Sequence, residues 1–296
     1  MPFNRSFLFA PGNHARRSEK AFTIGADAVI LDLEDAVPPA EKPAARPMVA
    51  AALARPRTCR GYVRVNAMST PWCYADLVGT VGPGVDGVVV PKVESAADLH
   101  AIDWLIANLE RDRGIEPGTL DLLPILETAA GIQRVDRILQ ARSLRPYSGR
   151  WRVKRVAFGG VDYARDLELR PSLDEPELAD ARARVVLASR GANLEPPIDS
   201  PWLHFKDAEG FSRSLDRSRR HGFQGRICIH PDQVAVVNKA YSPSAEEIAM
   251  AGRIVAAFRE AEAKGSAAIQ VDGQMIDYPV VHQAERLLES VRAAEQ

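Results

Sequence analysis

The sequence predicts a closed (β/α)8 barrel of the TIM type, followed by a helical extension at the C-terminus. The chain has 296 residues, and such a barrel often occupies about 250 residues as one domain. Short apolar runs typical of buried parallel strands recur along the chain, with helical segments between them. A Ser-Pro-Ser break at residues 242–244 precedes a new helix start. We therefore expect the barrel at residues 1–242 and a helical segment at residues 243–296.

Eight apolar runs are the predicted strands, and each ends in a polar or glycine-containing turn. They are Ser6 to Ala10, Ala28 to Leu33, Tyr62 to Val65, Gly87 to Val90, Leu122 to Leu126, Arg155 to Phe158, a weak run near Ile198, and Arg226 to Ile229. Because the seventh run is poorly marked, an open sheet is the alternative to a closed barrel.

Helix starts can be read from capping patterns. After the fourth run, Ser95 and Asp98 form an S-x-x-D capping box, and apolar residues follow at helical spacing. A second capping box, Ser244 with Glu247, opens the C-terminal segment, whose first helix should stop at Gly265. An Asp-Gly turn interrupts the helical pattern between residues 268 and 279, and the pattern resumes from Ala284 to Ala294.

Composition excludes several classes of function. The chain has 38 Lys and Arg against 39 Asp and Glu, so no overall field favours nucleic acid or an anionic membrane surface as a partner. No apolar stretch approaches the ~18 residues of a membrane span, and the first apolar run breaks too early for a signal peptide. Three widely separated cysteines suggest reduced thiols, so we expect a cytoplasmic protein.

One basic cluster precedes the sixth predicted strand. It consists of Arg150, Arg152, Lys154 and Arg155. We interpret it as a solvated loop in preference to a phosphate site.

Polar residues that follow the predicted strands should meet at one mouth of the barrel, where such folds carry their active sites. Five turns qualify, with the sequences Pro-Gly-Asn-His at 11–14, Asp-Leu-Glu-Asp at 32–35, Arg-Val-Asn at 64–66, Glu-Thr at 127–128 and Gly-Gly-Val-Asp at 159–162.

Glu127 and Asp162 end adjacent predicted strands, and adjacent parallel strands lie about 4.8 Å apart. Both carboxylates could then bind one cation. Oxygen donors without Cys or His favour a hard ion, Mg²⁺ before Mn²⁺, and disfavour zinc. The alternative is that both residues merely cap the helices that follow.

Three further groups are candidates for contacts with substrate or metal-bound water. In the turn formed by Gly159, Gly160 and Val161, the two glycines have no Cβ, so a ligand carboxylate can approach main-chain N–H groups; a tight structural turn is the alternative. Arg64, at the end of a buried strand, must face an anion, either a structural carboxylate or a developing enolate. The turn after the second strand carries more carboxylates than helix capping requires. We therefore expect these residues, Asp32, Glu34 and Asp35, to hydrogen-bond the metal's waters.

Seven motifs together resemble the citrate lyase beta subunit and malyl-CoA lyase family, in order and over nearly the whole chain. They are RSFLFAPG at residues 5–12, AVILDLEDAV at 28–37, RVN at 64–66, VVVPKVES at 88–95, ILETAAG at 125–131, FGGVDYARDL at 158–167 and GRICIHPDQ at 225–233.

The resemblance implies a Mg²⁺-dependent carbon–carbon lyase. Its substrate would be a 3-hydroxyacyl-CoA thioester of the malyl, citramalyl or citryl type, cleaved to acetyl-CoA and a 2-oxo acid. It implies that Glu127 and Asp162 hold the metal and that Arg64 stabilises the enolate. It also implies a homo-oligomer, a trimer or hexamer, in which Asp277 of the segment DGQMIDYP closes over a neighbouring subunit's barrel as acid or base.

Alternatives to this function are a beta subunit acting on a carrier-bound thioester within a citrate lyase complex, a thioester hydrolase, and a pyruvate-releasing aldolase. The aldolase is disfavoured because the turn after the second strand has no histidine. Ligands for the CoA phosphates are open, with Arg16, Arg17, Lys20 and Lys92 as candidates.

Overall fold

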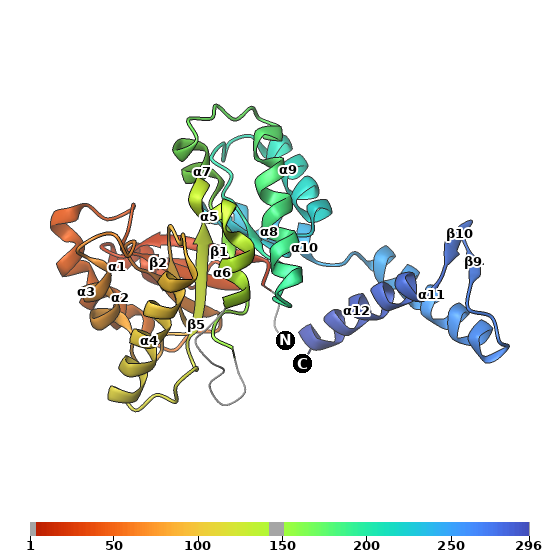
Figure 1. The fold of residues 1–296 in the computed structure, drawn as a ribbon, viewed down its shortest axis with the longest axis horizontal. Helices are drawn as coiled ribbons and strands as arrows, with labels where there is room; N and C mark the ends of the chain where they lie inside the picture. The colour runs from red at the N-terminus through yellow and green to blue at the C-terminus, as the bar shows by residue number, and fades with distance from the viewer. Residues whose placement is uncertain (1–3, 142–150, 296) are drawn as a thin grey trace. The chain divides into compact units, whose positions relative to one another are not determined.

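The structure is a computed structural model that describes residues 4–141 and 151–295 (Figure 1). It divides into two compact units, one formed by Asn4–Lys239 and a second that begins at Ala240. The first unit contains the barrel, and the second contains two long helices and a small hairpin.

The barrel is closed, and every strand in it is parallel to both neighbours. Its strands are β1 (Ser6–Pro11), β2 (Ala28–Asp32), β3 (Arg60–Arg64), β4 (Gly87–Val90), β5 (Asp121–Leu126), β6 (Ala157–Phe158), β7 (Ile198–Asp199) and β8 (Gly225–Cys228). The pairing of Ser6 in β1 with Arg226 in β8 closes the ring. The (β/α)8 prediction is confirmed, and the open-sheet alternative is wrong.

Helices follow the strands and lie outside the ring (Figure 1). They are α1 (Ala15–Ala21), η1 (Pro39–Glu41), α2 (Lys42–Leu53), α3 (Cys73–Thr80), α4 (Ala96–Asp112), α5 (Ala129–Gln133), α6 (Val135–Ala141), α7 (Gly160–Asp166), η2 (Pro176–Leu178), α8 (Ala179–Gly191), α9 (Ala208–His221) and α10 (Pro231–Tyr241). The predicted capping box of α4 is present, with Ser95 and Asp98 each bonding the other's main chain.

Large apolar side chains fill the interior of the barrel. Phe7, Ile30, Tyr62 and Val89 project inward from the first four strands and are almost fully buried. A packed interior closes the barrel to solvent below the mouth, so any ligand must bind above it.

Strand register places the functional candidates at one level of the barrel. Pro11 pairs with Asp32, and Asp32 pairs with Arg64. On the other side, Leu126 of β5 pairs with Phe158 of β6. The residues that follow these positions therefore emerge together at the carboxyl end of the sheet.

The basic cluster before β6 is not a solvated loop, and that interpretation is wrong. Arg152 is fully buried, and its guanidinium donates to Asp103 at 2.6 Å and to Glu110 at 2.7 Å, both on α4. Arg155 is also buried and donates to Glu195 at 2.7 Å. Carboxylates distant in sequence neutralise these cations, which no local pattern reveals; Arg150 lies outside the described residues.

The second unit contains α11 (Ala245–Ala263), β9 (Ile269–Val271), β10 (Gln274–Ile276) and α12 (Tyr278–Glu295). Its two helices pack side by side around Phe258, Ile276 and Val281. The Ser244–Glu247 capping box opens α11 as predicted. Positive φ angles at Asp272 and Gly273 turn the β9–β10 hairpin.

The expected start of the last helix at Ala284 is wrong, since α12 begins at Tyr278. Pro279 falls in the first helical turn, where a residue without an N–H group is tolerated. No helix within residues 4–141 or 151–295 is long and apolar enough to cross a membrane.

Candidate active site

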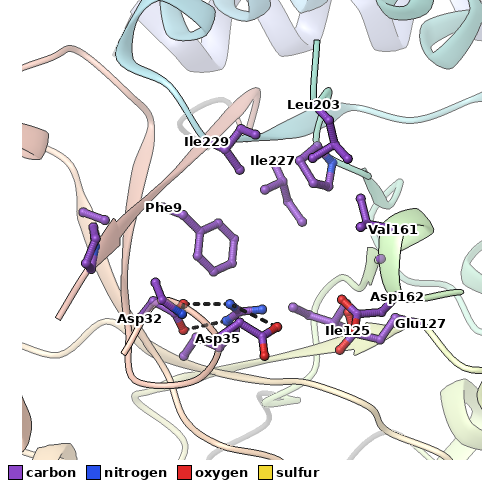
Figure 2. Close-up of a pocket in the computed structure, with 16 residues that line it drawn as sticks. Phe9, Asp32, Asp35, Ile125, Glu127, Val161, Asp162, Leu203, Ile227 and Ile229 are labelled. Atoms are coloured by element: carbon purple, nitrogen blue, oxygen red, sulfur yellow. Dashed lines mark hydrogen bonds and ion pairs between the residues drawn. The ribbon is translucent and has the colours of Figure 1, made fainter. Parts of the chain in front are cut away.

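A cavity of about 440 Å³ opens at the carboxyl end of the barrel strands (Figure 2). One part of its wall is charged and contains Asp32, Asp35, Arg64, Glu127 and Asp162. The lining also contains apolar side chains: Leu203, Ile227 and Ile229 lie across the cavity from the carboxylates, while Phe9 and Ile125 lie nearer the charged residues (Figure 2). Each of the five turns that the sequence predicted for the mouth therefore contributes at least one residue to this cavity.

Arg64, the last residue of β3, is held by two carboxylates. Its Nε and Nη2 atoms donate to the two oxygens of Asp32, each at 2.7 Å. A third nitrogen, Nη1, lies 2.9 Å from Glu34. The ring of Phe9 covers the guanidinium carbon, 4.6 Å from the ring centroid, so the group is fixed in one orientation.

Asp32 and Arg64 each stabilise the charged form of the other. Burial alone would raise the pKa of Asp32, but the charge and hydrogen bonds of Arg64 outweigh it and lower that pKa. Burial likewise disfavours the charged form of Arg64, yet Asp32 and Glu34 raise its pKa. The structural ion pair is therefore present, and Arg64 also faces the cavity, where a substrate oxyanion would find it preorganised.

Asp32 also organises the acidic turn after β2. Its oxygens accept the N–H groups of Glu34 at 2.9 Å and Ala36 at 3.0 Å. Lys42 stabilises the same turn by donating to the carbonyls of Leu33 and Glu34 at 2.7 and 2.6 Å. The side chain of Asp35 is 57% exposed and lies 3.9 Å from Arg64, which leaves it free to meet water or ligand.

Glu127 follows β5 directly and is buried. Its Oε1 atom accepts the main-chain N–H of Lys92 at 2.9 Å. The helix α5 is capped instead by Thr128, whose hydroxyl accepts the N–H of Gly131 at 3.1 Å. A helix cap is therefore not the role of Glu127.

Asp162 lies in the first turn of α7, and Figure 2 shows its carboxylate next to that of Glu127. It pairs with Arg165 at 2.7 Å. Burial and the nearby charges of Glu34 and Asp162 raise the pKa of Glu127 to about 8. The two carboxylates thus share a space in which negative charge is incompletely neutralised.

This pair fits a hard divalent cation. Both donors are oxygens, and a bound dication would offset the repulsion that raises the pKa of Glu127. No group of three or more His, Cys, Asp or Glu side chains in the described parts of the chain is arranged to hold a metal. Two protein carboxylates with water and substrate oxygens completing the shell are typical of Mg²⁺ sites.

The absence of a side chain at Gly159 has a structural reason that was not predicted. A Cβ atom there would lie 2.3 Å from Oε2 of Glu127 and 2.5 Å from its Cβ. The missing side chain thus makes room for the Glu127 carboxylate.

The N–H groups of Gly159 and Gly160 already have acceptors within the protein, and the predicted role of these glycines in substrate binding stays a prediction. Gly159 donates to the carbonyl of Leu126 at 3.0 Å, and Gly160 donates to the Ser200 hydroxyl at 2.9 Å. Val161 lines the cavity and is 40% exposed. Since α7 starts at Gly160, the main-chain donors available to a ligand are those of Val161 and Asp162 in its first turn.

Lys92 is a site residue whose position the sequence reasoning missed, since it was considered only for CoA phosphates. Its ammonium hydrogen-bonds Glu34 and lies 4.0 Å from Glu127 and 3.8 Å from Asp162. Burial lowers its pKa, but the hydrogen bond and charge of Glu34 raise it overall. A signal was available, because Lys92 follows β4 at the same end of the barrel as the other five turns.

Asp277, the remaining predicted residue, lies in the second unit between β10 and α12. It is half-buried, and its Oδ1 atom accepts the N–H of Val280 at 3.4 Å. This contact closes the first turn of α12. Its predicted role over a neighbouring barrel stays a prediction.

Comparison with known proteins agrees with this architecture. The chain matches the HpcH/HpaI aldolase/citrate lyase family over residues 5–231. It is 35% identical to citrate lyase subunit beta of Leuconostoc mesenteroides subsp. cremoris over 291 residues, which cover 98% of this chain and 93% of that protein. It is 34% identical to the L-malyl-CoA/beta-methylmalyl-CoA lyase of Cereibacter sphaeroides over 315 residues, covering 99% and 95% of the two chains.

A solved structure is similar over its full length. The crystal structure of protein CitE from Mycobacterium tuberculosis, in complex with magnesium, acetoacetate and coenzyme A, superposes with a TM-score of 0.78 at 30% identity. The match covers 99% of each chain. The chain described here belongs to the HpcH/HpaI aldolase/citrate lyase family.

Proposed function

We propose that this protein is a Mg²⁺-dependent carbon–carbon lyase. It cleaves a 3-hydroxyacyl-CoA thioester to acetyl-CoA and a 2-oxo acid. The observation that carries the proposal is that Arg64, fixed by Asp32 and Glu34, shares one cavity with the carboxylates of Glu127 and Asp162. A relative named for malyl-CoA cleavage and a neighbour crystallised with magnesium and coenzyme A support this assignment.

The reaction breaks the bond between C2 and C3 of the substrate. The C3 hydroxyl loses its proton and becomes the carbonyl of the 2-oxo acid, while the bonding electrons pass to the thioester as an enolate. A proton then adds to the enolate carbon to give the acetyl group. The site must therefore bind an oxyanion and move protons.

In this proposal Glu127 and Asp162 hold the cation, with Mn²⁺ as a substitute. When bound, Mg²⁺ supplies a Lewis acid and a template for the hydroxyl and carboxylate oxygens of the substrate. Arg64 stabilises the enolate oxygen, since a permanent cation in a fixed orientation requires little reorganisation. The apolar wall of Phe9, Ile227 and Ile229 lowers the local dielectric and so strengthens that interaction.

The proton donor or acceptor in this proposal is Asp277 of a neighbouring subunit in a trimer or hexamer. The support is the family resemblance of the segment around it. A helical pair with its own apolar core can carry such a residue as one piece.

The experiment is incubation of the purified chain with malyl-, citramalyl- and citryl-CoA plus Mg²⁺, with acetyl-CoA and the 2-oxo acid measured separately. We expect equal amounts of both products and no product after treatment with EDTA. Full activity in EDTA would overturn the proposal. Release of free CoA without acetyl-CoA would identify a thioester hydrolase, and pyruvate release from a free hydroxy-oxo acid would identify an aldolase.

A second candidate is a beta subunit that acts on a carrier-bound thioester. The identity of 35% with citrate lyase subunit beta favours it. The same panel separates the two once a carrier-bound thioester is added to it, because a subunit of this kind would cleave the carrier-bound thioester and leave the free CoA thioesters intact.

A further inference from the structure

Lys92 contacts two different carboxylates in the site, one through its main-chain N–H group and the other through its ammonium group. Its backbone is left-handed, with φ of 51°, a conformation that residues other than glycine adopt rarely. This conformation aims the N–H group at Oε1 of Glu127, 2.9 Å away. The side chain is thereby free to extend elsewhere.

The ammonium of Lys92 lies among three carboxylates. It hydrogen-bonds Oε1 of Glu34 and stands 4.0 Å from Glu127 and 3.8 Å from Asp162. The latter two distances are ion-pair contacts without a hydrogen bond. The side chain is 23% exposed, so its charge is only partly screened by water.

Glu34 is shared between two cations. Its Oε1 atom accepts from Lys92, while its Oε2 atom lies 2.9 Å from Nη1 of Arg64. A continuous series of ionic contacts therefore joins Asp32 and Arg64 through Glu34 and Lys92 to the Glu127–Asp162 pair.

A divalent cation on that pair would repel the ammonium, because both charges would face the same oxygens within a few ångströms. Among the described residues, the ammonium donates a hydrogen bond only to Glu34. Repulsion by the cation would therefore break its ion pairs with Glu127 and Asp162 and keep the one with Glu34. Glu34 in turn fixes one side of Arg64.

We propose that Lys92 is a positioning residue whose main-chain N–H fixes Glu127, and whose ammonium neutralises the Glu127–Asp162 pair until a divalent cation binds there and confines it to Glu34. This inference rests on the proposed function, since it takes that pair as the cation site. It couples occupancy of the site to the orientation of Arg64.

The direction in which cation affinity changes when Lys92 is replaced separates this role from a purely structural one. If Lys92 only stabilises the fold of the site, its loss weakens cation binding. If its ammonium competes with the cation, loss of the ammonium tightens binding. Turnover should fall in either case, so activity alone does not decide.

The experiment is Mn²⁺ binding to the metal-free protein, followed by electron paramagnetic resonance of free Mn²⁺. Lys92→Met keeps the length of the side chain and removes the charge, and we expect Mn²⁺ to bind about tenfold more tightly. Lys92→Arg keeps the charge and should bind Mn²⁺ as the wild type does. Unchanged or weaker binding by Lys92→Met would overturn the proposal.

Lys92→Gly tests whether backbone strain at this left-handed position, and not the lost charge, explains the result with Lys92→Met. Glycine adopts the left-handed conformation freely and keeps the N–H group that holds Glu127. We expect the same tightening of Mn²⁺ binding as in Lys92→Met, and weaker binding by Lys92→Gly would count against the proposal.

A double-mutant cycle with Glu34 tests the coupling. Glu34→Gln should weaken Mn²⁺ binding several-fold in the wild type, because the released ammonium returns to the Glu127–Asp162 pair. In the Lys92→Met background the same change should have a clearly smaller effect. Equal effects in both backgrounds would refute the coupling.

Wild-type protein and Glu127→Gln separate this inference from the proposed function. If wild-type protein binds no Mn²⁺, or Glu127→Gln binds it as well as wild type does, the proposed function itself fails. If wild type binds Mn²⁺, Glu127→Gln does not, and Lys92→Met changes nothing, only the role of Lys92 fails.

Discussion

Arg64 illustrates how single residues in this site are fixed by several partners at once. Two parallel hydrogen bonds to Asp32 and a contact with Glu34 leave the guanidinium little freedom. The planar fork of arginine suits this geometry, whereas a lysine ammonium would satisfy one oxygen at a time. The burial of the carboxylates then makes each contact stronger than it would be in water.

We predict that Arg64→Ala lowers kcat for acetyl-CoA release by roughly 10² to 10³-fold, the usual loss for an oxyanion donor. Arg64→Lys should recover only part of this loss, since it keeps the charge without the two-point bond. Steady-state kinetics with the best thioester measure both. Near-normal kcat with only a raised KM would argue against the oxyanion role.

Gly159→Ala should abolish or strongly weaken cation binding, because the added Cβ would overlap Oε2 of Glu127 at 2.3 Å. Titration of the metal-free variant with Mn²⁺ measures this. Gly191→Ala, at a position with nothing within 4 Å of the added atom, is the matched control and should bind as wild type does. Wild-type affinity in Gly159→Ala would show that Glu127 does not need this space.

Cation binding should depend on pH because the pKa of Glu127 is raised to about 8. Below that pH the cation must displace a proton, so we expect affinity to rise with pH and to level off above about 8. Mn²⁺ titrations across this range measure the dependence. Affinity that is independent of pH below this value would contradict the raised pKa.

The same group affects stability in the metal-free protein. A carboxyl whose pKa is higher in the folded chain binds more protons when folded. The free energy of unfolding should therefore decrease as pH rises from 4.5, the ordinary value, to about 8. Denaturant unfolding should show a shallower decrease in Glu127→Gln, since the amide does not titrate.

At the scale of elements, buried charges connect pieces that look unrelated in the sequence. Arg152 lies in the chain leading to β6, and its partners Asp103 and Glu110 are on α4. All three side chains are fully buried. The contact therefore ties the fourth helix to the sixth strand segment.

We predict that Arg152→Ala destabilises the protein by about 3–5 kcal/mol, because it removes a fully buried cation that bonds two fully buried carboxylates. Arg184→Ala removes an exposed pair with Asp180 on α8 and should cost at most ~0.5 kcal/mol. Denaturant unfolding of both variants measures the difference, from the shift of the transition midpoint at an unchanged dependence on denaturant concentration. Equal effects of the two substitutions would mean that the buried cluster is not compensated as described.

Element boundaries were predicted well where the signal is local. The capping boxes of α4 and α11 use main-chain and side-chain groups within four residues, so the sequence shows them directly. The strands β6 and β7 are only two residues long, and their pairing with longer neighbours defines them. That is why the seventh strand was weak in the sequence.

At the scale of the whole molecule, the proposal requires residues from two subunits in one site. An Arg64→Ala subunit keeps Asp277, and an Asp277→Asn subunit keeps Arg64. We predict that each homo-oligomer is nearly inactive and that co-assembled mixtures regain activity. A random equal mixture should restore about a quarter of the sites.

Activity of refolded or co-expressed mixtures measures this restoration, and mixtures of either variant with itself are the controls. Absence of recovery in a mixture shown to contain both subunits would contradict a shared site. It would place Asp277 with Arg64 of its own chain or outside the reaction.

The sequence by itself determined the alternation of strands and helices, the helical C-terminal segment and the set of polar residues at the mouth, because apolar periodicity, capping and strand ends are local patterns. Closure of the barrel was predicted against an open-sheet alternative, and the pairing of β1 with β8 decided it. It also identified Arg64, Glu127 and Asp162 as neighbours, since parallel strands bring their carboxyl ends together. Only the tertiary structure decided how these charges are paired. Lys92, Glu34 and the buried Arg152 find partners through contacts between distant segments, and Gly159 gives its space to Glu127 because two adjacent strands hold them face to face.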